Sequence, residues 1–351
     1  MKLIIQIPCL NEEEVLPVTL ADLPREVEGF DTVEWLVIDD GSTDRTSEVA
    51  REHGVDHILR FHANKGLAVA FQAGLDAALK LGADVVVNTD ADNQYCADDL
   101  PSLVAPIVAR EADMVIGDRN IRDHGEFSRV KRVLQSYGSW VVRRASGTDV
   151  ADATSGFRAY NREAALRLNV VSRFTYTLET IIQAGKSDLV VTHVPVRTNP
   201  KTRESRLFRS IPQYVKRSVA TIVRISVMYE PLPAFLWPAA IFALAGLALL
   251  VRFGWFYFTE PGPTGHVQSL IIGAALLIFA LQLVLLGVIG DLLRTNRIIS
   301  EETLQRTRKV ELALGIGADV VATRGASGPG DEEADENGVV DVNELTRSSA
   351  T

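Results

Sequence analysis

The sequence predicts an α/β domain with a doubly wound, mostly parallel sheet, followed by two apolar helices long enough to cross a membrane. In the first half of the chain, short runs rich in Val and Ile alternate with helical stretches, a rhythm typical of such sheets. In the second half, two uncharged segments each approach the roughly 20 residues that a helix needs to span a bilayer.

Five apolar runs in the first half are expected to form strands, and each ends in polar or glycine residues. They are Leu3–Pro8, Val33–Asp39, Asp56–Phe61, Val85–Thr89 and Met114–Gly117. The helices expected between them are Glu12–Leu23, Thr43–His53, Gly66–Leu81 and Leu100–Arg110. Ligands of such sheets bind beyond the carboxyl ends of the strands, so the polar residues that follow the strands are the candidates for a functional site.

Composition narrows the class of protein. The 351-residue chain has a net charge of −9, of which eight acidic and two basic residues from Gly315 onward contribute −6. No domain is strongly basic, so we expect no nucleic-acid partner. Cys9 and Cys96 lie far apart in segments expected to be interior, which argues against a disulfide framework and favours a reducing, cytoplasmic environment.

The membrane segments are read from charge and length. Ala234–Val251 is uncharged over 18 residues and Val267–Gly290 over 24, and a connector rich in Pro and Gly joins them. We expect a transmembrane hairpin over 231–293 and a cytoplasmic helix over 294–314. Lys and Arg flank the hairpin but are absent from the connector, so the positive-inside rule places the α/β domain in the cytoplasm of a two-helix membrane protein.

The remaining segments complete the expected domain organisation. In residues 203–230, Arg and Lys alternate with large apolar residues. This pattern is typical of an amphipathic helix that lies on anionic headgroups, so we expect an interfacial helix here and membrane lipids as partners. Residues 1–202 would then form the α/β domain. Residues 315–351 are rich in Gly, Ala and acidic residues, and we expect this acidic tail to be disordered.

Two carboxylates follow the fourth expected strand, in Asp90-Ala91-Asp92-Asn93-Gln94. They are one residue apart and point to the same side of the chain. Mg²⁺ and Mn²⁺ take one or two carboxylates and complete their coordination with water and substrate phosphate oxygens. Asp90, Asp92 and the amide oxygen of Gln94 are therefore the candidate ligands of Mg²⁺ or Mn²⁺.

Three further polar clusters follow other strands. A carboxylate of Asp39-Asp40 can accept a hydrogen bond from a base edge, although Ser42 and Thr43 behind it also fit a simple helix cap. Pro8–Glu12 would form the neighbouring wall, and Asn64–Gly66 offers a cation and helix N–H groups to a phosphate. Each cluster alone is as well explained by a turn, but together at the ends of consecutive strands they predict a nucleotide pocket.

Five motifs follow one another in order: Pro-x-x-Asn-Glu from Pro8, Asp-Asp-Gly-Ser-Thr-Asp from Asp39, Asn-Lys-Gly-x-x-x-Ala from Asn64, Asp-Ala-Asp-x-Gln from Asp90 and Ser-Gly-Phe-Arg from Ser155. Over roughly Met1 to Tyr229 this order resembles the family two glycosyltransferases of the GT-A fold, and within them the dolichyl-phosphate mannose or glucose synthases. The resemblance implies inverting, one-step transfer of a single hexose from a UDP- or GDP-linked sugar to dolichyl or another polyprenyl phosphate, for glycan assembly or protein glycosylation.

The resemblance and the clusters together assign roles to individual residues. The candidate donor-binding residues are Pro8, Asn11, Glu12, Asp39, Asp40, Lys65, Asp90, Ala91 and Asp92. The candidate acceptor-phosphate residues are Arg119, Arg132, Ser136 and Arg206. Gly117-Asp118-Arg119 matches the family's Gly-Ser-Arg with Asp in place of Ser, and Glu204-Ser205-Arg206 resembles its Glu-Ser-Lys.

One pair of acceptor candidates has support from spacing as well. Arg132 and Ser136 are four residues apart in Phe127–Arg144, which reads as an amphipathic helix, so they share a face and can converge on one anion. The alternative is that Arg132 only touches lipid headgroups.

The candidate catalytic residues are Asp92, Arg119 and Glu179. A phosphate monoester has a second pKa near about 6, so the acceptor is already largely dianionic at neutral pH and needs charge neutralisation more than a general base. Glu179 is the candidate if a base is used, and an acid stabilised at the start of a helix explains it equally well.

Two alternatives stay open. A processive polysaccharide synthase shares the nucleotide-binding half, but its Gln-x-x-Arg-Trp motif is absent because no Trp here follows an Arg. A non-catalytic membrane scaffold or lipid carrier of the same fold would not need Asp90, Asp92 and Gln94 intact. The sequence leaves open the sugar, the nucleotide and the oligomeric state, and a homo-oligomer is compatible with it.

Overall fold

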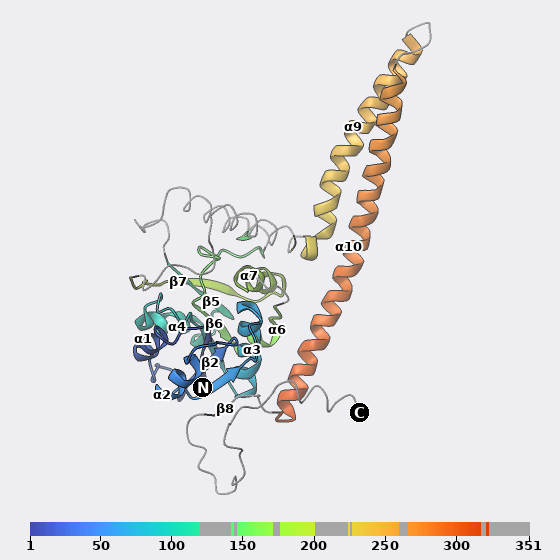
Figure 1. Ribbon diagram of the computed structural model, residues 1–351. Coiled ribbons are helices and arrows are strands. Elements are labelled where there is room, and N and C mark those ends of the chain that lie inside the picture. Colours follow the sequence, from blue (N-terminus) through green and yellow to red (C-terminus); the bar gives the residue numbers. More distant parts are fainter. Residues whose placement is uncertain are drawn as a thin grey trace. The chain divides into compact units, whose positions relative to one another are not determined.

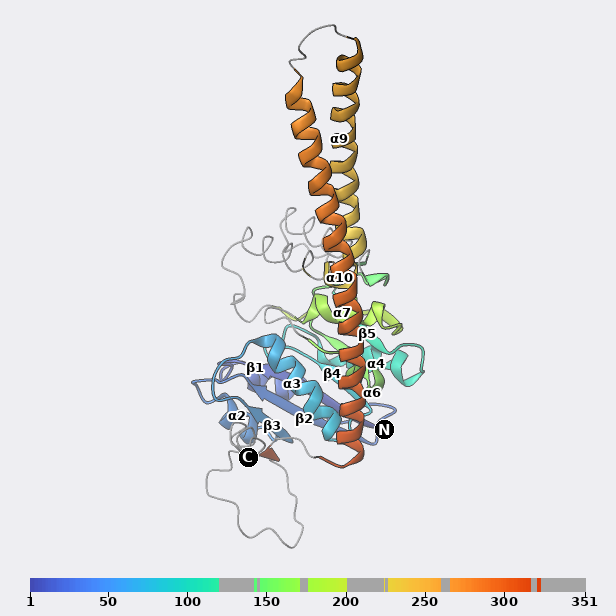
Figure 2. The same ribbon diagram turned by 90° about the vertical axis from the view of Figure 1, so that its right-hand side faces the viewer.

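The computed structural model describes residues 1–119, 142–143, 146–170, 176–200, 224, 227–259, 266–316 and 321–322. The chain forms two compact units, which we call the α/β unit (Met1–Lys216 with Leu304–Thr351) and the hairpin unit (Arg217–Thr303). Figure 1 and Figure 2 show the sheet and its helices in the first and two long helices in the second.

The α/β unit is built on one mixed sheet with the strand order β7-β5-β6-β4-β1-β2-β3-β8. Its strands are β1 (Lys2–Cys9), β2 (Thr32–Asp39), β3 (His57–Arg60), β4 (Val85–Asn88), β5 (Met114–Asp118), β6 (Arg158–Asn161), β7 (Val191–Pro195) and β8 (Val321–Ala322). The block β3-β2-β1-β4 is parallel, β6 is antiparallel to both of its neighbours, and β7 is parallel to β5.

Helices cover both faces of this sheet. They are α1 (Leu16–Asp22), α2 (Thr46–Glu52), α3 (Leu67–Lys80), α4 (Leu100–Val108), α6 (Arg162–Arg167) and α7 (Thr177–Lys186). Alternate β1 residues such as Ile5 and Ile7 share one core with apolar residues of α1, α2 and α4. On the other face, Gly74 of α3 lies against Gln6 and Ile38. Because both faces are covered, β1 is buried from Leu3 to its end, as expected of a central parallel strand.

The predicted α/β fold followed by two membrane-length helices is confirmed. The five expected strands all form, but β6 and β7 were not predicted, and β6 inserts antiparallel between β4 and β5. Arg158, the first residue of β6, pairs with Asn88 at the end of β4. The loop that precedes β6 is therefore delivered to the same edge as the carboxyl ends of β1, β2 and β4.

The hairpin unit contains α9 (Pro231–Thr259) and the first part of α10 (Val267–Ala313), which lie side by side in both views. Both helices are long and apolar enough to cross a membrane. They approach closely at two glycines, because a Cβ added to Gly246 would lie 2.9 Å from the carbonyl oxygen of Gly273. Small residues that let backbones approach are typical of helix pairs in membranes.

The end of α10 differs from the expected organisation. A two-helix hairpin over 231–293 and a separate helix over 294–314 were expected, but α10 runs unbroken to Ala313, and no Gly or Pro lies between Gly290 and Gly315. Within the α/β unit, Arg308 of α10 donates to the backbone oxygens of Leu166 and Leu168 at 3.1 and 3.0 Å. The last turns of α10 thus pack on α6.

Three predicted segments fall largely outside the described residues. In the tail expected to be disordered, Val321–Ala322 forms β8, whose Ala322 pairs with His57 of β3. The rest of 317–351 lies outside the described residues, as do most of the interfacial segment 203–230 and most of the helix expected over Phe127–Arg144.

Candidate active site

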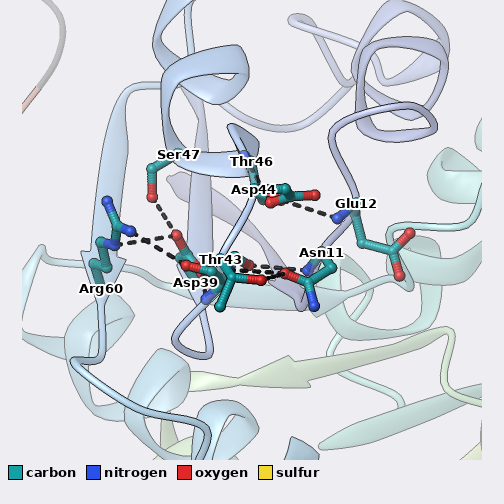
Figure 3. Close-up of polar contacts among 9 residues, drawn as sticks. Asn11, Glu12, Asp39, Thr43, Asp44, Thr46, Ser47 and Arg60 are labelled. Atoms are coloured by element: carbon teal, nitrogen blue, oxygen red, sulfur yellow. Dashed lines mark hydrogen bonds and ion pairs between the residues drawn. The ribbon is translucent and has the colours of Figure 1, made fainter.

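The loop after β1 meets the loop after β2 at the carboxyl edge of the sheet. Asn11 turns the chain with a left-handed φ of 54°, which Asn tolerates better than most residues. Its side-chain oxygen accepts a hydrogen bond from the backbone N–H of Thr43 at 2.9 Å, and its own N–H donates to Ser42 Oγ at 3.0 Å. The N–H of Glu12 donates to Thr46 Oγ1 at 2.9 Å. The two loops therefore form one wall, as Figure 3 shows.

Asp39 stabilises the second of these two loops. Its side chain is fully buried, and its Oδ1 accepts the backbone N–H of Ser42 at 2.8 Å. Its Oδ2 accepts a hydrogen bond from the hydroxyl of Ser47 and lies 3.5 Å from Nε of Arg60 (Figure 3). Both oxygens are thus engaged inside the protein, which makes Asp39 a residue that shapes the loop.

Asp40 joins the wall to the loop before α3. Its two oxygens accept the backbone N–H groups of Lys65 and Gly66 at 2.7 and 2.9 Å. Burial raises the pKa of the Asp40 carboxyl, and these two hydrogen bonds partly oppose that effect. The contact depends on Gly41, which has a φ of 73° and where an added Cβ would lie 2.5 Å from the backbone of Ala63. Lys65 itself is exposed, with its amine 4.6 Å from the centre of the Phe61 ring.

The predicted metal ligands follow β4 directly. Asp92 accepts the backbone N–H of Gln94 at 3.2 Å in an Asx turn, and Asn93 between them adopts a left-handed φ of 54°. The carbonyl of Ala91 accepts the hydroxyl of Thr19 at 2.7 Å, which ties the turn to α1. The sharp turn places two carboxylates at one end of the strand.

The residues present fit a hard divalent cation. Burial and the neighbouring charge of Asp92 raise the pKa of Asp90 to about 7, and a cation between the two carboxylates would remove this repulsion. No cluster of three or more His, Cys, Asp or Glu suited to a metal occurs in the part of the chain that the structure describes. A pair of carboxylates is the protein share of a Mg²⁺ or Mn²⁺ site that substrate phosphates complete.

Arg119 is the next charged group at this edge. Its Nε donates to Asp152 Oδ2 at 2.6 Å, and its Nη2 donates to Asp152 Oδ1 at 3.1 Å and to Thr154 Oγ1 at 2.8 Å. Burial would raise the pKa of the Asp152 carboxyl, but the Arg119 guanidinium outweighs burial and holds that pKa below its ordinary value. Arg119 is thus fixed in position by a bidentate pair.

The other predicted residues are placed as follows. Pro8 is buried at the end of β1, opposite Ile38. Glu179 is 1% exposed in the first turn of α7, where the positive end of the helix favours a carboxylate. The acceptor candidates Arg132, Ser136 and Arg206 lie outside the described residues.

Sequence reasoning missed the residues that support the charged groups. They are Asn88, Tyr95, Asp152, Thr154 and Tyr176. The only signal for them was position, since Asp152 and Thr154 directly precede the Ser-Gly-Phe-Arg motif and Tyr95 directly follows the carboxylate turn.

Two hydrogen-bonded loops beside a carboxylate pair, at the carboxyl edge of a mixed sheet, are the arrangement expected of a nucleotide-sugar glycosyltransferase. Residues 4–168 match the family described as glycosyl transferase family 2. An uncharacterized glycosyltransferase of Mycobacterium tuberculosis is 36% identical over 197 residues, which covers 56% of this chain and 84% of that protein. The chain belongs to glycosyltransferase family 2.

Two further relatives are named for their activities. The UDP-N-acetylglucosamine–dolichyl-phosphate N-acetylglucosaminyltransferase of Methanococcus voltae is 28% identical over 214 residues, which covers 55% of this chain and 83% of that enzyme. The undecaprenyl-phosphate mannosyltransferase of Micrococcus luteus is 29% identical over 206 residues, with coverage of 56% and 83%. Both names specify a polyprenyl phosphate.

Solved structures share the fold. Glucosyl-3-phosphoglycerate synthase from Mycobacterium tuberculosis, in complex with Mn²⁺, UDP-glucose and phosphoglyceric acid, aligns with a TM-score of 0.52 at 20% sequence identity. The alignment covers 64% of this chain and 79% of that one. At this identity the likeness establishes the GT-A-like fold.

Proposed function

We propose that this chain transfers one hexose from a UDP- or GDP-linked sugar to dolichyl phosphate or a related polyprenyl phosphate. The observation that carries the proposal is the Asp90–Asp92 pair, which follows β4 at the same sheet edge as the Asn11 and Asp40 loops. Two membrane-length helices in the same chain support a lipid acceptor, and so do the names of the relatives.

The donor would lie along the wall formed by the first two loops. We assign the nucleoside to Pro8, Asn11, Glu12 and Asp40, with Lys65 near the diphosphate. Mg²⁺ or Mn²⁺ held by Asp90, Asp92 and Gln94 would neutralise the leaving diphosphate. The Asp39 carboxylate is already engaged by Ser42, Ser47 and Arg60, so in this proposal Asp39 shapes the loop and does not bind the donor itself.

The chemistry requires positioning more than proton transfer. A phosphate oxygen of the acceptor attacks the anomeric carbon, and the bond from that carbon to the diphosphate breaks with its electron pair on the leaving group. The dianionic acceptor needs no base for this step, since its second pKa is near about 6. In this proposal the acceptor phosphate is neutralised by Arg119, Arg132 and Arg206 and hydrogen-bonded by Ser136. Glu179 is the candidate only if a base is used.

The membrane helices would bring the enzyme to its substrate. A polyprenyl phosphate keeps its phosphate at the headgroup level, so a transferase anchored by α9 and α10 meets it at the bilayer surface. The connector between these helices lacks Lys and Arg while both flanks carry them. We therefore place the α/β unit on the cytoplasmic side.

The test uses the purified full-length chain in lipid–detergent micelles with Mg²⁺ or Mn²⁺. Labelled UDP-glucose, UDP-N-acetylglucosamine and GDP-mannose are each offered with dolichyl or undecaprenyl phosphate. We expect one donor to yield labelled lipid and an equal amount of nucleoside diphosphate, and we expect Asp92→Ala to yield neither. Failure of every donor and acceptor pair would overturn the proposal, and polymeric product would favour a processive synthase.

A further inference from the structure

The loop before β6 contacts two charged groups of the site from behind. We call residues Asp152–Gly156 the support loop. At one end, Asp152 and Thr154 bind the guanidinium of Arg119. At the other end, Gly156 lies directly against the carboxylate of Asp90. One short segment thus contacts both the predicted metal ligand and the predicted acceptor cation.

The contact between Gly156 and Asp90 leaves no room for a side chain. A Cβ added at Gly156 would lie 2.9 Å from Oδ2 and 3.0 Å from Oδ1 of Asp90, and 3.0 Å from the hydroxyl of Tyr176. Real Cβ atoms are rarely this close to other atoms. The Asp90 carboxylate can occupy its position because residue 156 is glycine.

Buried hydrogen bonds fix the backbone of Gly156. Its N–H donates to the hydroxyl of Tyr95 at 2.8 Å, and its carbonyl accepts Nδ2 of Asn88 at 2.9 Å. Nδ2 of Asn88 also donates to the hydroxyl of Tyr176 at 2.9 Å, and Oδ1 of Asn88 accepts Nε2 of Gln6 at 2.9 Å. These buried hydrogen bonds specify one position for the backbone of Gly156.

Arg158 shapes the support loop from the core. It is fully buried, its Nε donates to the carbonyl of Ser155 at 2.7 Å, and its Nη2 donates to the carbonyl of Ala153 at 3.0 Å. Its Nη1 donates to the carbonyl of Thr177 and to Thr180 Oγ1, each at 2.8 Å. A buried guanidinium needs its N–H groups satisfied, and here the acceptors are the support loop and the start of α7.

We propose that the support loop, held by Arg158, fixes the positions of both the metal ligand Asp90 and the acceptor cation Arg119. Gly156, Asp152 and Arg158 are then positioning residues that touch no substrate. The proposal rests on the proposed function, which makes Asp90 a metal ligand and Arg119 an acceptor contact.

The test separates the two ends of the loop. Mn²⁺ affinity is measured by electron paramagnetic resonance on the full-length chain with UDP or GDP, whichever binds. We expect Gly156→Ala to weaken Mn²⁺ affinity by about 10- to 100-fold, the usual loss when a group behind a metal ligand is changed, with little change in KM for the polyprenyl phosphate. Asp152→Asn should instead raise the KM for the polyprenyl phosphate with little change in Mn²⁺ affinity. Arg158→Lys should both weaken Mn²⁺ affinity and raise that KM.

Arg162→Lys is the matched control, because Arg162 also donates to a backbone carbonyl, that of Ala83 at 2.8 Å, away from the carboxylate pair. It should change both quantities less than twofold. Tyr95→Phe removes the acceptor of the Gly156 N–H and is the milder variant if Gly156→Ala does not fold.

The outcomes separate the two proposals. Unchanged Mn²⁺ affinity in both Gly156→Ala and Tyr95→Phe overturns the support-loop proposal and leaves the proposed function standing. Losses matched by Arg162→Lys overturn it too, since they would reflect general destabilisation. A wild-type chain that binds Mn²⁺ with neither nucleotide would overturn the metal assignment in the proposed function itself.

Discussion

Adjacent carboxylates at the sheet edge have different roles, and their hydrogen-bond partners decide which. Asp39 and Asp40 are neighbours, yet Asp39 accepts bonds from Ser42 and Ser47 inside the wall while Asp40 bridges to the N–H groups before α3. The carboxylate of Asp90 rests on Gly156. A sequence motif of two aspartates therefore combines one residue that braces a single loop with one that joins two loops.

At the residue scale, the metal assignment predicts that Asp92→Ala abolishes hexose transfer and leaves the fold intact. The half-buried Asp92 side chain is small, so removing it costs little packing but takes away half of the carboxylate pair that would hold the metal. The rate of lipid labelling should fall by at least roughly 100-fold, while the melting temperature without metal stays within experimental error. A near-normal rate, or full turnover in EDTA, would contradict the assignment.

The buried pair Arg119–Asp152 makes a prediction about stability. Arg119→Ala leaves a carboxylate that is 1% exposed without its cation, and such a loss costs about 3–5 kcal/mol of the free energy of unfolding. Denaturant unfolding of the full chain in detergent would measure this. The double variant Arg119→Ala/Asp152→Asn should recover part of the loss, because no buried charge remains unpaired. Equal stability of wild type and Arg119→Ala would show that the pair is not formed.

The same pair predicts a pH dependence. The pKa of Asp152 lies below its ordinary value of 3.8, so the folded chain keeps this carboxylate ionised at a pH where the unfolded chain protonates it. The stabilisation is complete above the ordinary pKa and is lost as pH falls through the lowered one. The stability difference between wild type and Asp152→Asn should therefore narrow below about pH 4. A difference that widens on acidification would contradict this.

At the scale of elements, burial decided which strands could be predicted. β1, β2 and β4 are covered on both faces, so they read as continuous runs of Val, Ile and Leu. β6 begins with Arg158 and ends with Asn161, and no local pattern shows that distant carbonyls would bury that arginine. β7 is only partly buried and includes Thr192 and His193, so its sequence pattern is more typical of a loop than of a strand.

The site residues that could be predicted are those that follow a strand closely in the sequence. Asn11, Asp40 and Asp90 directly follow their strands, so the α/β rhythm alone placed them at one edge. The groups behind them come from the loop before β6 and from Tyr176 at the start of α7. Their proximity depends on the antiparallel insertion of β6, which no periodicity in the sequence indicated.

The end of α10 gives a prediction at the same scale. Arg308 donates to two carbonyls at the end of α6 and lies 3.0 Å from Asp76 of α3, so it joins three helices of the α/β unit. Arg308→Ala should lower the free energy of unfolding by about 1–3 kcal/mol, since two buried carbonyls lose their donor. Arg306→Ala, at an exposed position of the same helix, should change it little. Equal effects of the two variants would show that the contact does not stabilise the unit.

At the scale of the whole molecule, the hairpin and its flanking charges predict a topology. A cysteine introduced at Thr264, between α9 and α10, should react with a membrane-impermeant thiol reagent in intact cells. A cysteine introduced at Ser300 should react only after the cells are permeabilised, because the positive-inside rule places both flanks in the cytoplasm. Both variants should be made in a chain whose Cys9 and Cys96 are replaced. The reverse labelling pattern would overturn the cytoplasmic assignment.

The bond from Asn88 to the carbonyl of Gly156 joins residues 68 positions apart, and this separation has a consequence for biogenesis. A ribosome releases β1 to β4 and the carboxylate turn well before β6 exists. Until β6 pairs with β4, the Asp90 carboxylate lacks the Gly156 backbone that lies against it in the folded chain. During that interval the first four strands are held together by their own apolar core.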